Sequence, residues 1–168
     1  YLNEEFHSYD TLLAENFYNT ENFKKSKNIY NDLSKKGKAF HWYASKQLSR
    51  IYIQDNNKEK ALKLLSNAYK NLINKDIYVT FDYAEFLKNN EKFKESIPYY
   101  TKILNEVEKS HPLYVEATDG RGVAYERIGE WDKAEKDLLL SLEIDPDQAY
   151  VINYLAYSWI EKGINIQK

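Results

Sequence analysis

The chain has 168 residues, of which 43% are hydrophobic and 30% are charged, a composition typical of a folded globular protein. Its formal net charge of −2 gives no general attraction to nucleic acid or anionic membranes, and the absence of Cys excludes a disulfide framework and a thiolate metal site. Only 5 Gly and 3 Pro are present, which argues against a turn-rich β-sandwich and favours long helices.

No apolar run reaches the roughly 18 residues that a membrane-spanning helix needs. The chain contains no Met and begins with Tyr1. We therefore interpret it as a processed or excised piece, from which an export signal could have been removed. Because a protein without Cys tolerates both reducing and oxidising surroundings, the sequence leaves cytoplasm and periplasm both open.

The first part of the chain predicts two pairs of amphipathic helices. Residues 3–38 carry apolar positions at helical spacing on both sides of a polar break at 19–22. Residues 39–75 repeat this arrangement around a break at 55–57. Gly37 is expected to close the first pair, because glycine accepts the left-handed conformation at a helix end.

The second part predicts two further pairs and a lone helix. Residues 76–112 form the third pair, residues 113–146 the fourth, and residues 147–168 a fifth first helix that ends near Gly163. The chain stops before the second helix of this fifth unit.

Three local signals refine these helices. Asp76 is a candidate N-cap. Pro98 is expected to bend its helix or to delay the regular start of that helix. Asp145 and Pro146 predict a cap followed by proline at the first helical position.

Small residues recur where the two helices of each pair would cross. Those of the first helices are spaced by 35, 35, 38 and 34 residues: Ala14, Ser49, Ala84, Gly122 and Ala156. Those of the second helices are each followed four residues later by Tyr or Leu: Ser26, Ala61, Ser96 and Ala134. The 38-residue spacing predicts an insertion of about four residues around 108–111, as a longer helix or loop.

This pattern resembles the tetratricopeptide repeat (TPR), a two-helix unit of about 34 residues with the consensus W-x2-L-G-x2-Y…A-x3-F…P. The clearest copy is GVAYERIGEWDKAEKDLLLSLEIDP, residues 122–146, which departs from the consensus just before this stretch, where Thr118 and Arg121 occupy the Trp and Leu positions. The resemblance implies an all-α fold, a right-handed α-solenoid of stacked antiparallel helix hairpins. It covers residues 1–168 as one domain of about four and a half units, and residues 145–163 are similar to bacterial members.

No constellation for catalysis is recognisable. His7, His41 and His111 lie far apart and lack carboxylates at ligand spacing, so no metal site is expected. Gly120 and Gly122 are interpreted as helix-packing residues, because no strand precedes them and the third glycine of a dinucleotide loop is missing. The acidic series from Glu130 to Asp137 (Glu130, Asp132, Glu135 and Asp137) is interpreted as mostly solvated helix face. We predict no enzyme activity, no catalytic residue and no cofactor.

The resemblance also implies where a ligand would bind, because first helices line the concave surface of such solenoids. The inward residues that this register selects are Ser8, Thr11, Glu15, Tyr18, Tyr43, Lys46, Arg50, Ile53, Tyr78, Phe81, Glu85, Lys88, Glu116, Asp119, Val123, Glu126, Tyr150, Asn153 and Tyr157. Lys46 and Arg50 could together grip a carboxylate or phosphate, or form a salt-bridged face. Thr11 and Glu15 stand where the family's carboxylate clamp needs Lys and Asn, which disfavours that clamp.

These observations predict a scaffold that binds a peptide or partner protein in the concave groove. Two alternatives stay open. One is self-association as a homodimer through Ile152, Leu155 and Trp159, which lack the cover of a second helix. The other is a regulatory arm of a larger enzyme whose catalytic part lies outside this chain. Nucleic-acid binding and membrane insertion are not expected.

Overall fold

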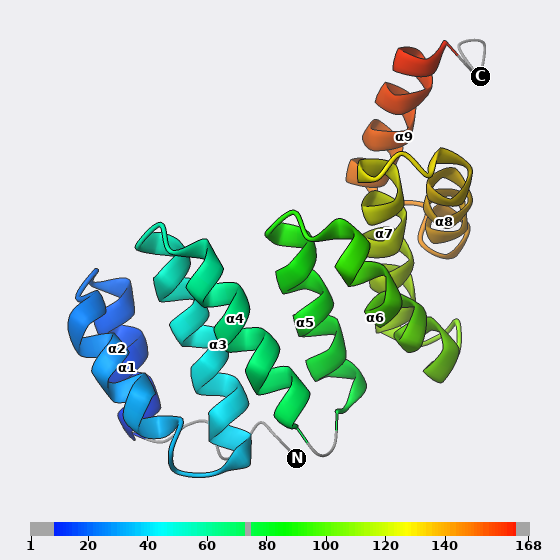
Figure 1. Cartoon of the computed structure of the whole chain (residues 1–168). Coiled ribbons are helices and arrows are strands. Elements are labelled where there is room, and N and C mark those ends of the chain that lie inside the picture. Colours follow the sequence, from blue (N-terminus) through cyan, green and yellow to red (C-terminus); the bar gives the residue numbers. More distant parts are fainter. Residues whose placement is uncertain (1–8, 73–74, 164–168) are drawn as a thin grey trace. The chain divides into compact units, whose positions relative to one another are not determined.

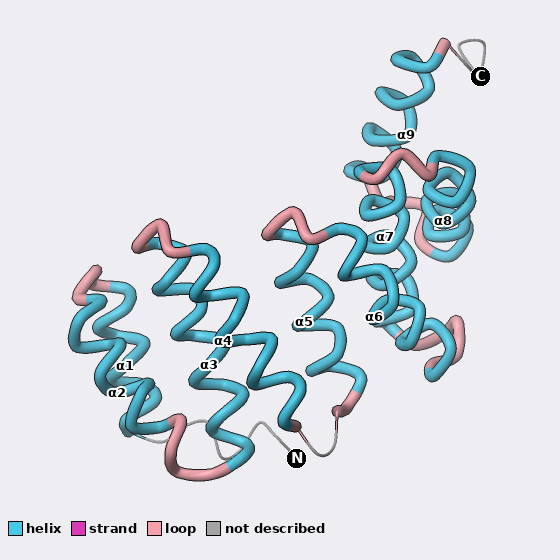
Figure 2. Tube along the Cα trace, viewed as in Figure 1, coloured by secondary structure: helices cyan, strands magenta, loops and turns pink. Residues whose placement is uncertain are grey.

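The computed structural model describes residues 9–72 and 75–163, which form nine α-helices and no strand (Figures 1 and 2). The predicted all-α class is thus confirmed, while the expected start of the first helix near residue 3 lies outside the described residues. In chain order the helices are α1 (Tyr9–Asn19), α2 (Phe23–Leu33), α3 (Lys38–Gln54), α4 (Lys58–Asn71), α5 (Ile77–Asn89), α6 (Phe93–Glu106), α7 (Pro112–Arg127), α8 (Trp131–Ile144) and α9 (Ala149–Lys162).

The helices fall into two compact units, residues 1–75 and residues 76–168. The first unit holds the hairpins α1–α2 and α3–α4, and the second holds α5–α6, α7–α8 and the single helix α9. Their boundary coincides with the predicted boundary between the second and third repeats. The single-domain assignment stays a prediction.

Each of the four hairpins turns through one residue with a positive φ angle. These residues are Glu21 (59°), Asn56 (57°), Glu91 (64°) and Gly129 (82°). In each turn the next N–H bonds to the carbonyl five residues earlier, as from Asn57 to Tyr52 at 2.7 Å and from Glu130 to Tyr125 at 2.9 Å. This Schellman-type ending satisfies carbonyls that a helix end would otherwise leave unpaired. The predicted polar breaks are therefore real turns of one repeated type.

Small residues mark the closest approach within each hairpin, as the sequence predicts. The Oγ of Ser26 donates to the carbonyl of Ala14 at 2.9 Å, and the Oγ of Ser49 donates to that of Ala61 at 3.2 Å. A Cβ added to Gly122 would lie 2.9 Å from Cγ of Leu138. Helix axes can approach this closely only where the side chains between them are small.

Each unit has its own core. In the first, Tyr30, Leu33 and Leu48 are buried in one cluster with small residues of α1 and α3. In the second, Tyr100 and Ile103 of α6 fill the space between α5 and α7. A Cβ added to Gly120 would lie 2.7 Å from the ring of Tyr100, so this glycine leaves room for the tyrosine.

Two predicted helix ends are wrong. Helix α2 already ends at Leu33, and Gly37 instead stands before α3 as its N-cap residue, with φ of 150°. Pro146 lies in the turn before α9, whose N-cap is Gln148. The Gln148 side chain donates to the carbonyls of Ser141 at 3.1 Å and Asp145 at 2.9 Å, so it bridges the end of α8 to the start of α9.

The predicted cap of α5 is confirmed. The Asp76 carboxylate accepts a hydrogen bond from the N–H of Val79 at 2.8 Å and so caps α5. The predicted insertion around 108–111 lies in the loop before α7, which begins with Pro112 in its first turn and has 16 residues, against 13 in α5 and 17 in α3. Pro98 lies inside α6, which begins at Phe93 and ends at Glu106, so the predicted delay of the helix start is wrong and the predicted bend stays a prediction.

Candidate functional site

In the first unit, the predicted inward residues of α1 and α3 meet. The hydroxyl of Tyr43 donates to Oε1 of Glu15 at 2.5 Å, and the ring of Tyr43 packs on that of Tyr30 with 6.1 Å between centroids. Burial raises the pKa of Tyr30 to about 12. Burial and the hydrogen bond to Glu15 raise the pKa of Tyr43 further still. Both phenols therefore stay protonated at neutral pH.

Arg50 is not a free cation. Its guanidinium carbon lies 4.7 Å above the centroid of the Tyr18 ring, and its Nη1 donates to Gln47 at 2.8 Å. Lys46 is half-buried on the same helix. Thr11 has 2% of its surface exposed, so this predicted contact residue is part of the core of the unit and unavailable to a ligand.

In the second unit, Glu85 of α5 is the centre of a hydrogen-bonded group. It accepts from the hydroxyl of Tyr100 at 2.5 Å and from Nζ of Lys88 at 2.7 Å. Phe81, one turn earlier, packs edge-on against Tyr100 with 6.3 Å between centroids. Burial raises the pKa of Tyr100, and the charge of Glu85 adds to this effect.

Asp119 of α7 lies next to this group. Burial raises its pKa to about 6 from an ordinary value of 3.8; Lys88 opposes the shift and Glu85 adds to it. Tyr150 of α9 also opposes the shift in the pKa of Asp119. Its Oδ1 is buried without a hydrogen-bond partner, so this carboxylate keeps unused capacity to accept a hydrogen bond.

The remaining predicted residues of the second unit differ in exposure. Glu126 accepts from the hydroxyl of Tyr154 at 2.6 Å, which ties α7 to α9. Tyr78 and Tyr157 are 60% and 63% exposed, and Glu116 and Asn153 are also exposed. The Tyr78 ring lies 6.0 Å from that of His111, centroid to centroid. These exposed side chains are free to contact a partner.

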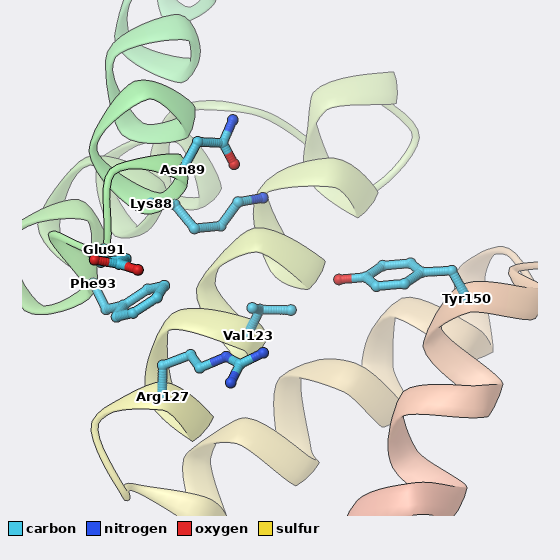
Figure 3. Close-up of a pocket in the computed structure, with 7 residues that line it drawn as sticks. All are labelled: Lys88, Asn89, Glu91, Phe93, Val123, Arg127 and Tyr150. Carbon is cyan, nitrogen blue, oxygen red and sulfur yellow. The ribbon is translucent and has the colours of Figure 1, made fainter. Parts of the chain in front are cut away.

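A cleft of about 550 Å³ opens between the first helices of the second unit (Figure 3). Its lining comes from α5, the following turn, the start of α6, α7 and α9: Lys88, Asn89, Glu91, Phe93, Val123, Arg127 and Tyr150. In Figure 3 the amine of Lys88 and the hydroxyl of Tyr150 reach toward the space beside Val123, and Arg127 lies below it.

Of this lining, Lys88, Val123 and Tyr150 belong to the inward face that the sequence predicts. Asn89, Glu91 and Phe93 lie at the hairpin turn, and Arg127 is in the last turn of α7. The repeat pattern selects residues in the middle of each first helix. It does not show that the turn between α5 and α6 also lines the cleft. Arg127 directly follows Glu126, which the repeat pattern selects. This adjacency is the one sequence signal for Arg127 as a lining residue.

A second hollow of about 550 Å³ lies along α4 in the first unit, next to Lys60, Lys63 and Leu64. Among the residues that the structure describes, no group of three or more His, Asp or Glu side chains could hold a metal ion. No helix in the same part of the chain is long and apolar enough to cross a membrane.

The acidic series of α8 is partly buried, against expectation. Asp137 is buried and forms an ion pair with Arg121, with Nε and Oδ2 2.7 Å apart. Glu135 accepts a hydrogen bond from Nε1 of Trp159 at 2.6 Å. Glu130 and Asp132 are exposed as expected. Half of this series therefore binds neighbouring helices rather than water.

No protein-family model and no curated protein matches the sequence. Solved structures with a similar fold include YrrB, described as a TPR protein with an unusual peptide-binding site (TM-score 0.63, 17% identity, 85% of this chain and 71% of that chain covered). Others are MamA from Desulfovibrio magneticus RS-1 (0.71, 11%, 92% and 84%) and MamA MSR-1 (0.67, 16%, 92% and 86%). Together with the repeated hairpins, these likenesses show that the chain has the TPR fold, an all-α solenoid of helix hairpins.

Proposed function

We propose that this protein is a protein-interaction scaffold that binds a peptide or partner protein on the concave face formed by its first helices. The observation that carries the proposal is the cleft between α5, α7 and α9. Its volume of about 550 Å³ lies within the roughly 300–1,000 Å³ of ligand pockets. YrrB, which shares the fold, is described as having a peptide-binding site.

The side chains around the cleft suit a peptide. Tyr150 and Phe93 offer aromatic surface, and tyrosine adds a hydrogen-bonding group with few rotatable bonds. Lys88 and Arg127 offer donors for carbonyl or carboxylate oxygens. An extended peptide carries all of these complementary groups.

The test starts from peptides selected from a random displayed library against the full chain. Their affinity is then measured by calorimetry for the wild type and for Tyr150→Ala and Arg127→Ala. We expect each substitution to weaken binding by at least about tenfold, the loss typical of a residue that contributes about 1.4 kcal/mol.

Leu139→Ala is the matched control. Leu139 is an exposed apolar residue of α8, a second helix, and does not line the cleft. The proposal predicts unchanged affinity for this variant. Peptides that bind the Tyr150 and Arg127 variants normally but lose affinity for Leu139→Ala would place recognition on the second helices and contradict it.

A further inference from the structure

Basic and acidic residues are unevenly divided between the two units. Residues 1–75 carry 13 Lys and Arg against 8 Asp and Glu, whereas residues 76–168 carry 11 against 18. The formal net charges are therefore +5 and −7, although the whole chain has only −2. A surface of the first unit can thus attract an acidic partner even though the chain as a whole is slightly acidic.

The basic surplus of the first unit is concentrated on its second helices. Together α2 and α4 contain seven Lys against one Asp and one Glu. The matching helices of the second unit lack this surplus, because α6 has two Lys and two Glu and α8 has two Lys against two Asp and two Glu. The surplus is therefore a property of α2 and α4 and not a general feature of second helices in this repeat.

The lysines in the first turns of α4 are not neutralised by carboxylates. Nζ of Lys60 lies 4.4 Å from the centroid of the Tyr52 ring, and Nζ of Lys27 in α2 lies 4.9 Å from the same centroid. Lys27 forms an ion pair with Asp55 at 2.5 Å, but within the described residues neither Lys60 nor Lys63 forms an ion pair. Both charges of α4 therefore remain available to an acidic partner.

The hollow of about 550 Å³ along α4 lies beside these lysines. Its lining includes Lys60, Lys63, Leu64 and Asn67, which recur at intervals of three or four residues and so share one face of the helix. Leu64 packs against the core of the first unit and is half-buried, whereas both lysines are exposed. Glu59 adds a carboxylate to the lining. The hollow thus combines an apolar side chain with two cations and one anion.

These groups fit an acidic peptide better than a nucleic acid. Carboxylates of Asp or Glu can pair with the exposed lysines, and an apolar side chain of the peptide can cover Leu64. Proteins bind single-stranded nucleic acid largely through aromatic side chains on which the bases stack. None of the described residues that line the hollow is aromatic.

We propose that the face of α4 formed by Lys60, Lys63 and Leu64 (the α4 face) binds an acidic, partly apolar segment of a partner protein. Carboxylates of the segment lie beside the two lysines, and an apolar side chain of the segment packs on Leu64. This surface belongs to a second helix and shares no residue with the cleft between α5, α7 and α9. The inference therefore goes beyond the proposed function and does not depend on it.

The test uses peptides of Asp, Glu and apolar residues, selected from a displayed library against the full chain. Their affinity is measured by calorimetry for the wild type, Lys63→Glu and Lys136→Glu. Lys136 is the matched control, because it is exposed on α8 two residues after the small residue Ala134, as Lys63 is after Ala61 on α4. We expect binding at least about tenfold weaker for Lys63→Glu, since an attraction becomes a repulsion, and unchanged binding for Lys136→Glu.

Two further measurements separate a defined site from a general attraction between charges. Glu59→Gln removes a carboxylate from the hollow and should tighten binding roughly two- to fivefold, the effect of one exposed charge pair. Peptides whose apolar residues are replaced by Ser should bind more weakly, because they leave Leu64 uncovered. Lys63→Glu and Lys136→Glu change the net charge equally, so equal losses of affinity would show that only total charge attracts the peptide and would overturn the proposal. Circular dichroism of each variant shows whether the helices are retained.

Two other occupants of the α4 face would also overturn the proposal. One is a nucleic acid, shown by a thymidine oligonucleotide that binds the wild type more tightly than any selected peptide and loses affinity for Lys63→Glu. The other is a second copy of the chain, shown by an oligomer in sedimentation velocity that Lys63→Glu abolishes. The homodimer surface predicted from the sequence is a different one, and two of its three residues are covered: Leu155 is buried, and Trp159 is half-buried with its Nε1 bonded to Glu135.

This proposal and the proposed function fail separately. Peptides of the α4 face should bind Tyr150→Ala like the wild type, because Tyr150 lines the cleft of the second unit. If every selected peptide loses affinity for Tyr150→Ala and none does for Lys63→Glu, the α4 face proposal is overturned and the proposed function stands. An acidic library that yields no binding peptide overturns the α4 face proposal alone.

Discussion

Arg121 of α7 and Asp137 of α8 form a two-point ion pair across their hairpin, with Nε 2.7 Å from Oδ2 and Nη2 2.9 Å from Oδ1. The two residues are 16 positions apart, and the same spacing joins apolar or aromatic residues in the other hairpins: Leu13 and Ile29, Leu48 and Leu64, Tyr83 and Tyr99. The rings of Tyr83 and Tyr99 lie 4.9 Å apart. One repeat therefore replaces an apolar contact by a buried ion pair, which explains why Arg121 departs from the repeat consensus.

Arg121→Leu alone should destabilise the chain by about 3 kcal/mol, because it leaves the Asp137 carboxylate buried without its partner. Arg121→Leu together with Asp137→Leu restores the apolar pair of the other repeats and should lie within about 1 kcal/mol of the wild type. Urea unfolding of the two single variants and the double variant measures the coupling free energy between Arg121 and Asp137. Additive effects of the two substitutions would contradict the assigned ion pair.

Glu21→Gly should stabilise the chain by about 0.5–1 kcal/mol. Glu21 has a φ angle of 59°, and this left-handed conformation costs a residue with a Cβ roughly 1–2 kcal/mol, partly offset by the greater freedom of glycine in the unfolded chain. Lys63→Gly, at an exposed position inside α4, is the control and should cost about 0.5–1 kcal/mol. Chemical denaturation followed by circular dichroism compares the two, and a loss of stability in both variants would count against the turn assignment.

Asp119→Asn should stabilise the chain at pH 7.5 by about 1–2 kcal/mol, since one pKa unit corresponds to about 1.4 kcal/mol. The folded-state pKa is raised to about 6, so between about pH 4 and 6 the folded chain binds more protons than the unfolded chain at this residue. Stability from Asp119 therefore decreases as pH rises through that window, and the penalty is complete above it.

The difference between wild type and Asp119→Asn cancels the titration of the groups that do not interact with Asp119. Urea unfolding at pH 7.5 and pH 4.5 should show the advantage of the variant shrinking or disappearing at the lower pH. An advantage that is the same at both values would mean that Asp119 has an ordinary pKa in the folded chain.

Gly122→Leu should destabilise the chain by roughly 1–3 kcal/mol, because even a Cβ at this position would lie 2.9 Å from Cγ of Leu138 and the core must shift to admit more atoms. Ala149→Leu, at an exposed position of α9, adds a larger side chain without a clash and serves as the control. Thermal unfolding measures the melting temperature of each variant, which should be lower for Gly122→Leu than for Ala149→Leu. Equal melting temperatures would show that the α7–α8 crossing is not closely packed.

The repeat pattern alone predicts most of the fold. The small residues at Ala14, Ser49, Ala84 and Gly122 mark the helix crossings correctly, because only small side chains let two helices approach so closely. The polar breaks between helices are equally visible, since a turn must end one helix and cap the next. These features are local or periodic, and a sequence displays such features directly.

The candidate site is less visible in the sequence. Thr11 fits the inward register but is buried, and Asp137 fits a solvated face but is paired with Arg121. Gln148 rather than Pro146 sets the start of α9, because its amide reaches two carbonyls at the end of α8. In each case the outcome depends on which groups of another helix lie within hydrogen-bond reach, and helical spacing contains no information about that.

The sequence by itself determined the helices and their pairing into hairpins, because these follow from the period of small and apolar residues. Only the tertiary structure decided that Lys88, Arg127 and Tyr150 share one cleft. The physical reason is that a cleft is the space that several packed helices leave between them. Its position depends on the joint geometry of those helices, which no single segment of sequence contains.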